Sequence, residues 1–245
     1  MGKSRLSAYG LTDTGLRRAS NEDSWLVRCE TGCFLVADGM GGAAAGEIAS
    51  RMFLHIAEQT KGRPDERSRE QAVAQLKESF IAANTMIRKH VVQHPEDTGM
   101  GCTAELLLTY ESGFALGHIG DSRAYRLRRG HLVRLTKDHS LVQEQVDQGL
   151  ISTEEARTHR LRNVISRAVG VQEDLEVDII QGGLQAGDLF LLCSDGLTDV
   201  VSDDELCTIL LRQDALADKA ARCIEQANAG GGRDNITVVL VQVEP

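Results

Sequence analysis

The chain has 245 residues, of which 42% are hydrophobic and only 4% aromatic, and its formal net charge is −9. This length can bury a substantial core, and the acidic balance argues against nucleic acid as a partner. No apolar run approaches the ~20 residues that cross a bilayer, and the N-terminal residues lack the apolar segment of a signal peptide. We therefore expect a cytoplasmic protein without a membrane partner.

Strand and helix patterns alternate in the first half of the chain. Short strands are expected at residues 6–10, 24–29 and 33–37. A helix is expected from Ala43 to Gln59, and a longer one carries an apolar face between Val73 and Val91. Four strands follow, and turn residues between them predict hairpins and antiparallel pairing. They are expected at residues 102–110, 113–119, 122–127 and 131–135.

The second half begins with a polar, helical stretch. Three helices are expected to start at a Ser-x-x-Gln or Ser-x-x-Glu capping pattern, at Ser140, Ser152 and Ser202. A fourth should start at Asp214. Strands are expected at residues 175–180, 188–193 and 235–243, the last one apolar on both faces. Strand blocks separated by helix pairs predict an α+β fold, with sheet packed on sheet and helices outside.

The six cysteines do not suggest a disulfide framework. They include no C-x-x-C pair and stand mostly in apolar runs, where free cysteine acts as a small hydrophobe. Cys29 and Cys33 are four residues apart, but no companion His/Cys pair supports a zinc site. Buried free thiols are therefore expected.

Acidic residues recur at the ends of apolar strand candidates, beside glycine or another turn residue. They are Asp38, Asp121, Asp195 and Asp234, with Glu22 and Asp23 leading into a further strand. A single Asp-Gly pair indicates only a turn. Strand ends at one edge of a sheet converge, however, and clustered carboxylates repel one another unless cations neutralise them. Oxygen ligands with few His or Cys favour hard divalent ions over zinc.

A glycine-rich turn, Gly39-Met40-Gly41-Gly42, precedes the first expected helix. Such a turn can cradle phosphate at a helix N-terminus. A nucleotide-binding P-loop is excluded, because Glu47 stands where that motif requires lysine. We expect the glycines instead to let the backbone approach a metal ion.

Five spaced motifs occur in order along nearly the whole chain, from about Tyr9 to Val243. They are Thr12-Asp13-x-Gly15-x-x-Arg18-x-x-Asn21-Glu22-Asp23, Asp38-Gly39-Met40-Gly41-Gly42, Gly120-Asp121-Ser122-Arg123, Cys193-Ser194-Asp195-Gly196 and Gly232-Arg233-Asp234-Asn235-Ile236-Thr237. The chain thereby resembles the metal-dependent protein serine/threonine phosphatases of type 2C, in their compact bacterial form.

The resemblance implies a fold and a reaction. The fold is α+β, a four-layer α-β-β-α sandwich of two antiparallel sheets flanked by helices, in one catalytic domain over residues 1–245 with a flap at about 140–170. The reaction is hydrolysis of phosphoserine and phosphothreonine by in-line attack of a water that bridges two divalent metals. The partners implied are phosphorylated proteins and an opposing serine/threonine kinase.

The resemblance also implies a ligand set for Mn²⁺ or Mg²⁺. Asp38 bridges two tightly bound ions. Asp195 and Asp234 complete one ion, while Gly39 offers its backbone carbonyl to the other and Glu22 reaches the waters of that ion.

Three further roles come from the same resemblance. Asp23 hydrogen-bonds metal-bound water, and Arg18 binds the substrate phosphate through its bidentate guanidinium. Asp121, shared with Asp195, belongs to a third and weaker metal site.

The chain departs from the family pattern at one position. Met40 stands where some members place a histidine as general acid, so water or another group must protonate the leaving alkoxide. His139 and His159 lie in the flap segment and are expected to be surface histidines. Four other flap residues either contact substrate or solvate a helix: Arg160, Arg162, Asn163 and Arg167.

Two alternatives stay open beside the general phosphatase. One is a non-catalytic relative that acts as a binding module, which would be expected to have lost metal ligands. The other is a phosphatase of the same fold that acts on bacterial regulators of sigma factors.

Overall fold

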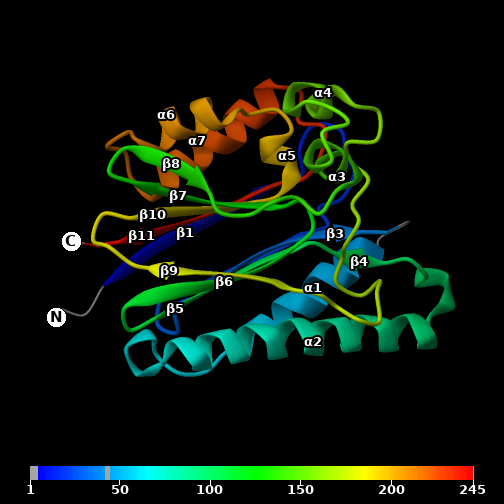
Figure 1. The fold of residues 1–245 in the computed structure, drawn as a ribbon, viewed down its shortest axis with the longest axis horizontal. Helices are drawn as coiled ribbons and strands as arrows, with labels where there is room; N and C mark the ends of the chain where they lie inside the picture. The colour runs from blue at the N-terminus through cyan, green and yellow to red at the C-terminus, as the bar shows by residue number, and fades with distance from the viewer. Residues whose placement is uncertain (1–4, 42–44, 245) are drawn as a thin grey trace.

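The computed structural model describes residues 5–41 and 45–244 as two antiparallel sheets stacked face to face, with helices on both outer faces (Figure 1). The first sheet has five strands in the order β1-β11-β10-β7-β8. They are β1 (Leu6–Asp13), β11 (Ile236–Val243), β10 (Leu189–Cys193), β7 (Arg123–Arg128) and β8 (His131–Arg134). The last strand of the chain therefore lies inside this sheet, paired with the first from Leu6 opposite Val243 to Asp13 opposite Ile236.

The second sheet has six strands, five of them in the order β2-β3-β5-β6-β9. These five are β2 (Asp23–Arg28), β3 (Cys33–Met40), β5 (Ala104–Tyr110), β6 (Gly113–Ile119) and β9 (Asp178–Gly183). The short strand β4 (Gly101–Cys102) pairs with the end of β3 at Gly39 and Met40. The expected sandwich of two antiparallel sheets is confirmed.

Helices cover both sheets. The second sheet packs against α1 (Ala45–Glu58) and α2 (Arg69–Gln93), and the first against α5 (Asp195–Thr198), α6 (Asp203–Leu210) and α7 (Leu216–Ala229). The segment after β8 holds α3 (Leu141–Asp147) and α4 (Thr153–Thr158), and short 3₁₀ turns occupy Pro64–Glu66 and Pro95–Asp97. No helix within the described ranges is long and apolar enough to cross a membrane.

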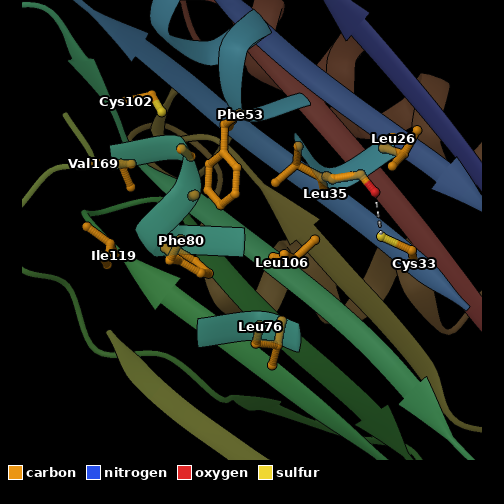
Figure 2. Close-up of a cluster of buried hydrophobic side chains, with 14 of the residues drawn as sticks. Leu26, Cys33, Leu35, Phe53, Leu76, Phe80, Cys102, Leu106, Ile119 and Val169 are labelled. Atoms are coloured by element: carbon orange, nitrogen blue, oxygen red, sulfur yellow. Dashed lines mark hydrogen bonds between the residues drawn. The ribbon is translucent and has the colours of Figure 1, made fainter. Parts of the chain in front are cut away.

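Apolar side chains fill the space between each pair of layers. Below the second sheet, Phe53 of α1 meets Phe80 of α2 edge to face at 4.8 Å, close to Leu35 and Leu106 of the sheet (Figure 2). Between the sheets, Phe114 and Phe190 make a similar contact at 4.9 Å. This burial on both faces explains the near-continuous apolar run of β11.

Local sequence signals were mostly reliable. The pattern Ser-x-x-Glu forms a full capping box at Ser152 and at Ser202, and Ser140 caps α3. All six cysteines are free thiols; four are buried, whereas Cys29 and Cys207 are half-buried.

Several element boundaries differ from expectation, most clearly at β9 and α7. The strand expected at 175–180 runs instead from Asp178 to Gly183, because β6 pairs with it as far as Gly183 despite its two glycines. The helix expected at Asp214 begins at Leu216, since Asp214 instead accepts hydrogen bonds from Arg212 and Arg222. The expected start at Ala43 falls outside the described residues, and α1 is described from Ala45.

Candidate metal centre

Two of the expected site carboxylates face each other across one strand pair. The register of β2 and β3 places Asp23 opposite Asp38. Thr103 fixes the backbone at Asp38: its N–H donates to the Asp38 carbonyl at 2.9 Å, and its Oγ1 accepts from the Asp38 N–H at 3.3 Å. Like charges directly opposite in a sheet destabilise it. This edge therefore brings two acidic groups together at an energetic cost.

Asp23 also joins the two sheets. Its Oδ2 accepts hydrogen bonds from Thr237 Oγ1 at 2.6 Å and Ser194 Oγ at 2.9 Å, both of which belong to the first sheet or its connections. Its Oδ1 is buried and finds no hydrogen-bond partner within residues 5–41 and 45–244. Desolvation raises the pKa of Asp23 to about 6, although hydrogen bonds with Thr237, Ser194 and Asp38 oppose that rise.

Asp38 and Asp195 sit at the centre of the acidic group. Desolvation, followed by the charges of Asp23, Asp195 and Asp121, raises the pKa of Asp38 well above its ordinary range. The pKa of Asp195, the first residue of α5, is likewise raised well above its ordinary range by desolvation and then by Asp121 and other nearby carboxylates. Asp195 Oδ1 is a second buried oxygen that lacks a partner in the described part of the chain. The carboxylates of Asp121 and Asp23 raise the pKa of both Asp38 and Asp195, so these residues form one cluster.

Asp121 lies on the side of the cluster nearest the flap. Desolvation and then the charge of Asp138 raise its pKa to about 7, while Arg123 opposes the rise. A cavity of about 250 Å³ opens beside Asp121 and Asp195. Asp199 also lines this cavity, four residues after Asp195, and accepts a hydrogen bond from Arg162 of the flap at 3.4 Å. Asp199 is not predicted by the sequence pattern, because Asp195-Gly196 suggests a turn and not the short helix that places both residues together.

Arg18 and Asp234 contact each other directly. Arg18 Nη2 donates to Asp234 Oδ2 at 2.7 Å, while the Arg18 side chain remains 51% exposed. The other oxygen of Asp234 accepts from the N–H of Asn235 at 2.8 Å. The side chain of Asn235 accepts from the Glu22 N–H at 2.9 Å and donates to the carbonyls of Thr14 and Ser20. Asn235 thus fastens the loop that carries Arg18 and Glu22 to the start of β11, a role that its motif alone does not indicate.

Gly39 is enclosed by backbone. Its N–H donates to the Glu22 carbonyl at 3.2 Å, and a Cβ at Gly39 would lie 2.2 Å from the carbonyl oxygen of Gly46 in α1. A Cβ at Gly46 would in turn lie 2.6 Å from Glu22 Oε2. Desolvation, together with Asp234 and Glu47, raises the pKa of Glu22 against the opposing effect of Arg18. The glycines at positions 39 and 46 therefore permit the close approach of α1 to the site loop.

The expectation that His139 is a surface histidine is wrong. Its side chain is only 9% exposed and accepts a hydrogen bond from the N–H of Gly120 at 3.1 Å. His159 is half-buried, and its Nδ1 accepts from the Leu161 N–H. Of the flap arginines, Arg162 contacts Asp199 and Arg167 contacts Asp178, so both pair with carboxylates and do more than solvate a helix. Neither Arg160 nor Asn163 is buried.

The chemistry of the cluster fits hard divalent cations. The candidate donors are carboxylate and carbonyl oxygens, which Mg²⁺ and Mn²⁺ prefer. Two of the carboxylates have a buried oxygen without a partner in the described residues, and several pKa values are raised by mutual charge. No set of three His, Cys, Asp or Glu side chains in the described ranges has the geometry of a closed coordination sphere. The fit therefore rests on donor type, burial and charge, and not on preformed ligand distances.

A comparison with protein families decides the identity of the domain. The model of the family described as protein phosphatase 2C matches residues 12–236. The chain belongs to the protein phosphatase 2C family. The resemblance drawn from the five motifs is thereby confirmed.

Bacterial relatives of this phosphatase 2C chain extend over nearly all of it. It is 41% identical over 236 residues to the serine/threonine protein phosphatase PstP of Mycobacterium tuberculosis, a match that covers 95% of this chain and 44% of PstP. The chain thus spans less than half the length of that relative. It is 37% identical over 235 residues to the serine/threonine phosphatase stp of Listeria monocytogenes, which covers 94% of this chain and 93% of stp.

Solved structures of the family share the fold. A crystal structure of M. tuberculosis PstP superposes with a TM-score of 0.91 at 40% identity, covering 98% of this chain and 99% of the other. The PstP catalytic domain in complex with two manganese ions gives a TM-score of 0.87 at 38% identity, with the same coverage. The expected phosphatase 2C sandwich is confirmed.

Proposed function

We propose that this chain is a metal-dependent phosphatase that hydrolyses phosphoserine and phosphothreonine in proteins, using Mn²⁺ or Mg²⁺. The observation that carries the proposal is the convergence of desolvated carboxylates at one edge of the sandwich in a phosphatase 2C chain. Such groups raise one another's pKa, and divalent cations relieve their repulsion. Residues 1–245 would form one catalytic domain, with the flap at about 140–170.

The ligand assignments are those that the family resemblance implies, and the burial and mutual charge of the carboxylates support them. We assign Asp38 to both cations, Asp195 and Asp234 to one of them, and the Gly39 carbonyl and Glu22 to the other. A third, weaker cation is assigned to Asp121 and Asp195, and Asp199 joins them because it lines the same cavity. When bound, the two principal cations supply Lewis acidity and a water nucleophile at neutral pH.

Arg18 is assigned to the substrate phosphate. Its contact with Asp234 uses one of the five guanidinium N–H groups, and the others remain available to phosphate oxygens. Half of the side chain is exposed, so an incoming phosphoprotein can reach it. The contact with Asp234 also orients the guanidinium beside the carboxylate cluster before substrate arrives.

Proton handling is divided between Asp23 and solvent. Asp23 has a pKa of about 6 and a buried oxygen without a partner in the described residues, so it can accept a hydrogen bond or a proton near neutral pH. Met40 carries no transferable proton. Both ring nitrogens of His139 are already engaged, with Gly120 and Asp178. We therefore assign protonation of the leaving alkoxide to water.

The wider setting follows from the chemistry. The substrates would be phosphorylated proteins, and the enzyme would oppose a serine/threonine kinase in the cytoplasm. The alternative of a non-catalytic binding module predicts lost ligands, whereas every expected acidic position is filled. Nothing in the site favours a phosphatase restricted to sigma-factor regulators.

The test is hydrolysis of a phosphothreonine peptide by purified protein. Activity should vanish in excess EDTA and return when Mn²⁺ or Mg²⁺ is added beyond the chelator. Full turnover in excess EDTA would exclude the proposal. Absence of turnover with Mn²⁺, while the same preparation binds the metal, would favour the non-catalytic alternative.

A further inference from the structure

Another polar cavity lies at the end of the first sheet away from the carboxylate cluster. It has a volume of about 520 Å³ and opens between the β7–β8 turn, the β9–β10 loop and the α6–α7 loop. β10 begins at this cavity with Leu189 and ends two residues before Asp195. At ~3.3 Å per residue, that strand and its flanks separate the cavity from Asp195 by roughly 20 Å. Figure 1 shows the three connections at the end of the sandwich away from α5.

The lining of this distal cavity carries more positive than negative charge. It contains four basic and two acidic residues: Arg128, Arg129, Arg212 and Lys219, and Asp188 and Asp214. The cavity thus has a surplus of two positive charges, in a chain whose formal net charge is −9. A hollow lined mainly by one sign of charge concentrates ions of the opposite sign.

Both carboxylates of the distal cavity are already paired. Asp188 is fully buried and accepts two hydrogen bonds of 2.6 Å from Arg128, which is the bidentate geometry of a strong ion pair. Asp214 accepts from Arg212 at 2.5 Å and from Arg222 at 3.2 Å. Neither carboxylate is therefore free to neutralise the other basic groups of the cavity.

Those other basic groups are Arg129 and Lys219, which have no carboxylate partner among residues 5–41 and 45–244. Arg129 is exposed in the β7–β8 turn and donates to the side-chain carbonyl of Gln185 at 3.4 Å. Lys219 is only 7% exposed, and its ammonium donates to the Leu210 carbonyl at 2.7 Å. That bond uses one of the three ammonium N–H groups.

Capping of α6 does not by itself account for a buried lysine. A lysine can bond the last carbonyls of a helix from the surface and keep its ammonium in water. Desolvation instead lowers the pKa of Lys219, and the charge of Asp214 only opposes that effect. Buried cations are rare unless they are paired. The ammonium of Lys219 beside a polar cavity is therefore placed to receive an anion.

We propose that the distal cavity binds a dianionic phosphate group through Lys219 and Arg129. The two cations without a carboxylate partner match the two charges of such a group, and ammonium and guanidinium are the usual side-chain donors to phosphate oxygens. The volume falls in the range of small-molecule sites, so the cavity has room for whatever carries the phosphate. The ligand is either free phosphate or a small phosphorylated molecule.

The test is calorimetric titration of inorganic phosphate into Arg18→Ala protein in EDTA, at about pH 8, where the phosphate is mostly dianionic. This background lacks the cations and the phosphate ligand assigned to the catalytic site. Adding Lys219→Met should weaken binding about tenfold or more, by loss of a charge-assisted hydrogen bond. Adding Arg129→Gln should weaken it about threefold. The matched control is Arg69→Gln, at an exposed position of α2, which should leave binding unchanged.

The choice of anion tests the chemistry of the distal cavity. Sulfate should compete with phosphate, whereas the monoanion acetate should bind about tenfold more weakly or less. Acetate that binds as well as phosphate would overturn the proposal, as would undetectable phosphate binding or an unchanged affinity in folded Lys219→Met protein. O-phosphoserine distinguishes the two sources. Tighter binding than that of phosphate would assign the cavity to a phosphorylated small molecule, and equal or weaker binding would assign it to free phosphate.

Nuclear magnetic resonance locates the anion without a change in the distal cavity. In nitrogen-15-labelled Arg18→Ala protein, phosphate should shift the amide signals of Arg129 and Gly187, which line the cavity. Shifts confined to the loops of the metal centre would overturn the proposal. A folding failure of Lys219→Met therefore leaves the distal site testable. Neither measurement needs metal or turnover, so a negative result would leave the proposed function standing.

Discussion

Replacing Asp38 with asparagine should have opposite effects on activity and on the stability of the metal-free protein. The substitution keeps the size of the side chain and the two backbone bonds to Thr103, but it removes the charge opposite Asp23. Two unit charges ~5 Å apart at an effective dielectric constant of ~20 repel by roughly 3 kcal/mol. This is an upper figure, because the raised pKa of Asp38 leaves it partly protonated. Asp38→Asn should therefore raise the free energy of unfolding of the metal-free protein by about 1–3 kcal/mol.

The same substitution should lower catalytic activity. A carboxylate assigned to both principal cations is a main electrostatic element of the site, so its loss should lower kcat on the order of 10³-fold, or about 4 kcal/mol. Thermal unfolding in EDTA and phosphopeptide turnover in Mn²⁺ measure the two effects. For a chain of this size, each kcal/mol gained raises Tm by about 2–4 °C.

The matched control is Asp174→Asn, which removes an equal charge at an exposed position. It should change neither measurement. A folded Asp38→Asn enzyme whose kcat lies within about tenfold of wild type would refute the bridging role. A lower Tm in EDTA would refute the repulsion at the β2–β3 edge.

Three further outcomes are expected. Arg18→Ala should raise KM for phosphopeptide and weaken inhibition by free phosphate in parallel, and unchanged phosphate inhibition would remove Arg18 from the phosphate site. The pKa values of Asp23 and Asp121 are raised to about 6 and about 7, so the folded metal-free chain binds protons more tightly than the unfolded chain, whose carboxyls titrate near 4. Urea unfolding in EDTA should therefore show stability falling as pH rises from about 4 to about 7, with a shallower fall in Asp121→Asn; an identical slope in that variant would contradict the pKa assignment. Arg67 is buried and donates to four backbone carbonyls. Arg67→Ala should therefore lower the free energy of unfolding in urea by about 3 kcal/mol or more, whereas Arg63→Ala, at an exposed position, should lower it by less than about 0.5 kcal/mol. Similar losses in the two variants would show that the buried hydrogen bonds contribute little.

Features set by neighbouring residues were predictable from the sequence. The capping boxes at Ser152 and Ser202 depend on a glutamate three residues later, and both formed. The hairpin at Arg129-Gly130 needs two residues of positive φ, and they have φ values of 51° and 82°. In such cases the types of one to four neighbouring residues determine the local conformation, because few other conformations compete with it.

Features set by distant packing were not predictable. His139 looked like a surface residue because its partners, Gly120 just after β6 and Asp178 at the start of β9, are 19 and 39 positions away. The shift of β9 arose from pairing with β6, which overrode the turn preference of its glycines. The convergence of carboxylates was anticipated from strand ends, but the register that sets Asp23 opposite Asp38 is a property of the assembled sheet. The roles assigned to individual site residues stay predictions.

The interior position of β11 has a consequence for how the protein can fold. Of the strands in this sheet, β11 comes last in the sequence and lies between β1 and β10, and its pairing with β1 joins residues more than 200 positions apart, from Leu6 with Val243 to Asp13 with Ile236. Until β11 has been synthesised, the edges of β1 and β10 that pair with it stay unpaired. Pairing β11 with β1 then closes a loop of most of the chain, and closing so long a loop slows folding. The same strand begins two residues after Asp234 and supplies Thr237 to Asp23. The acidic site therefore needs β11 and the residues just before it, so a chain cut off before Asp234 would lack part of the acidic cluster.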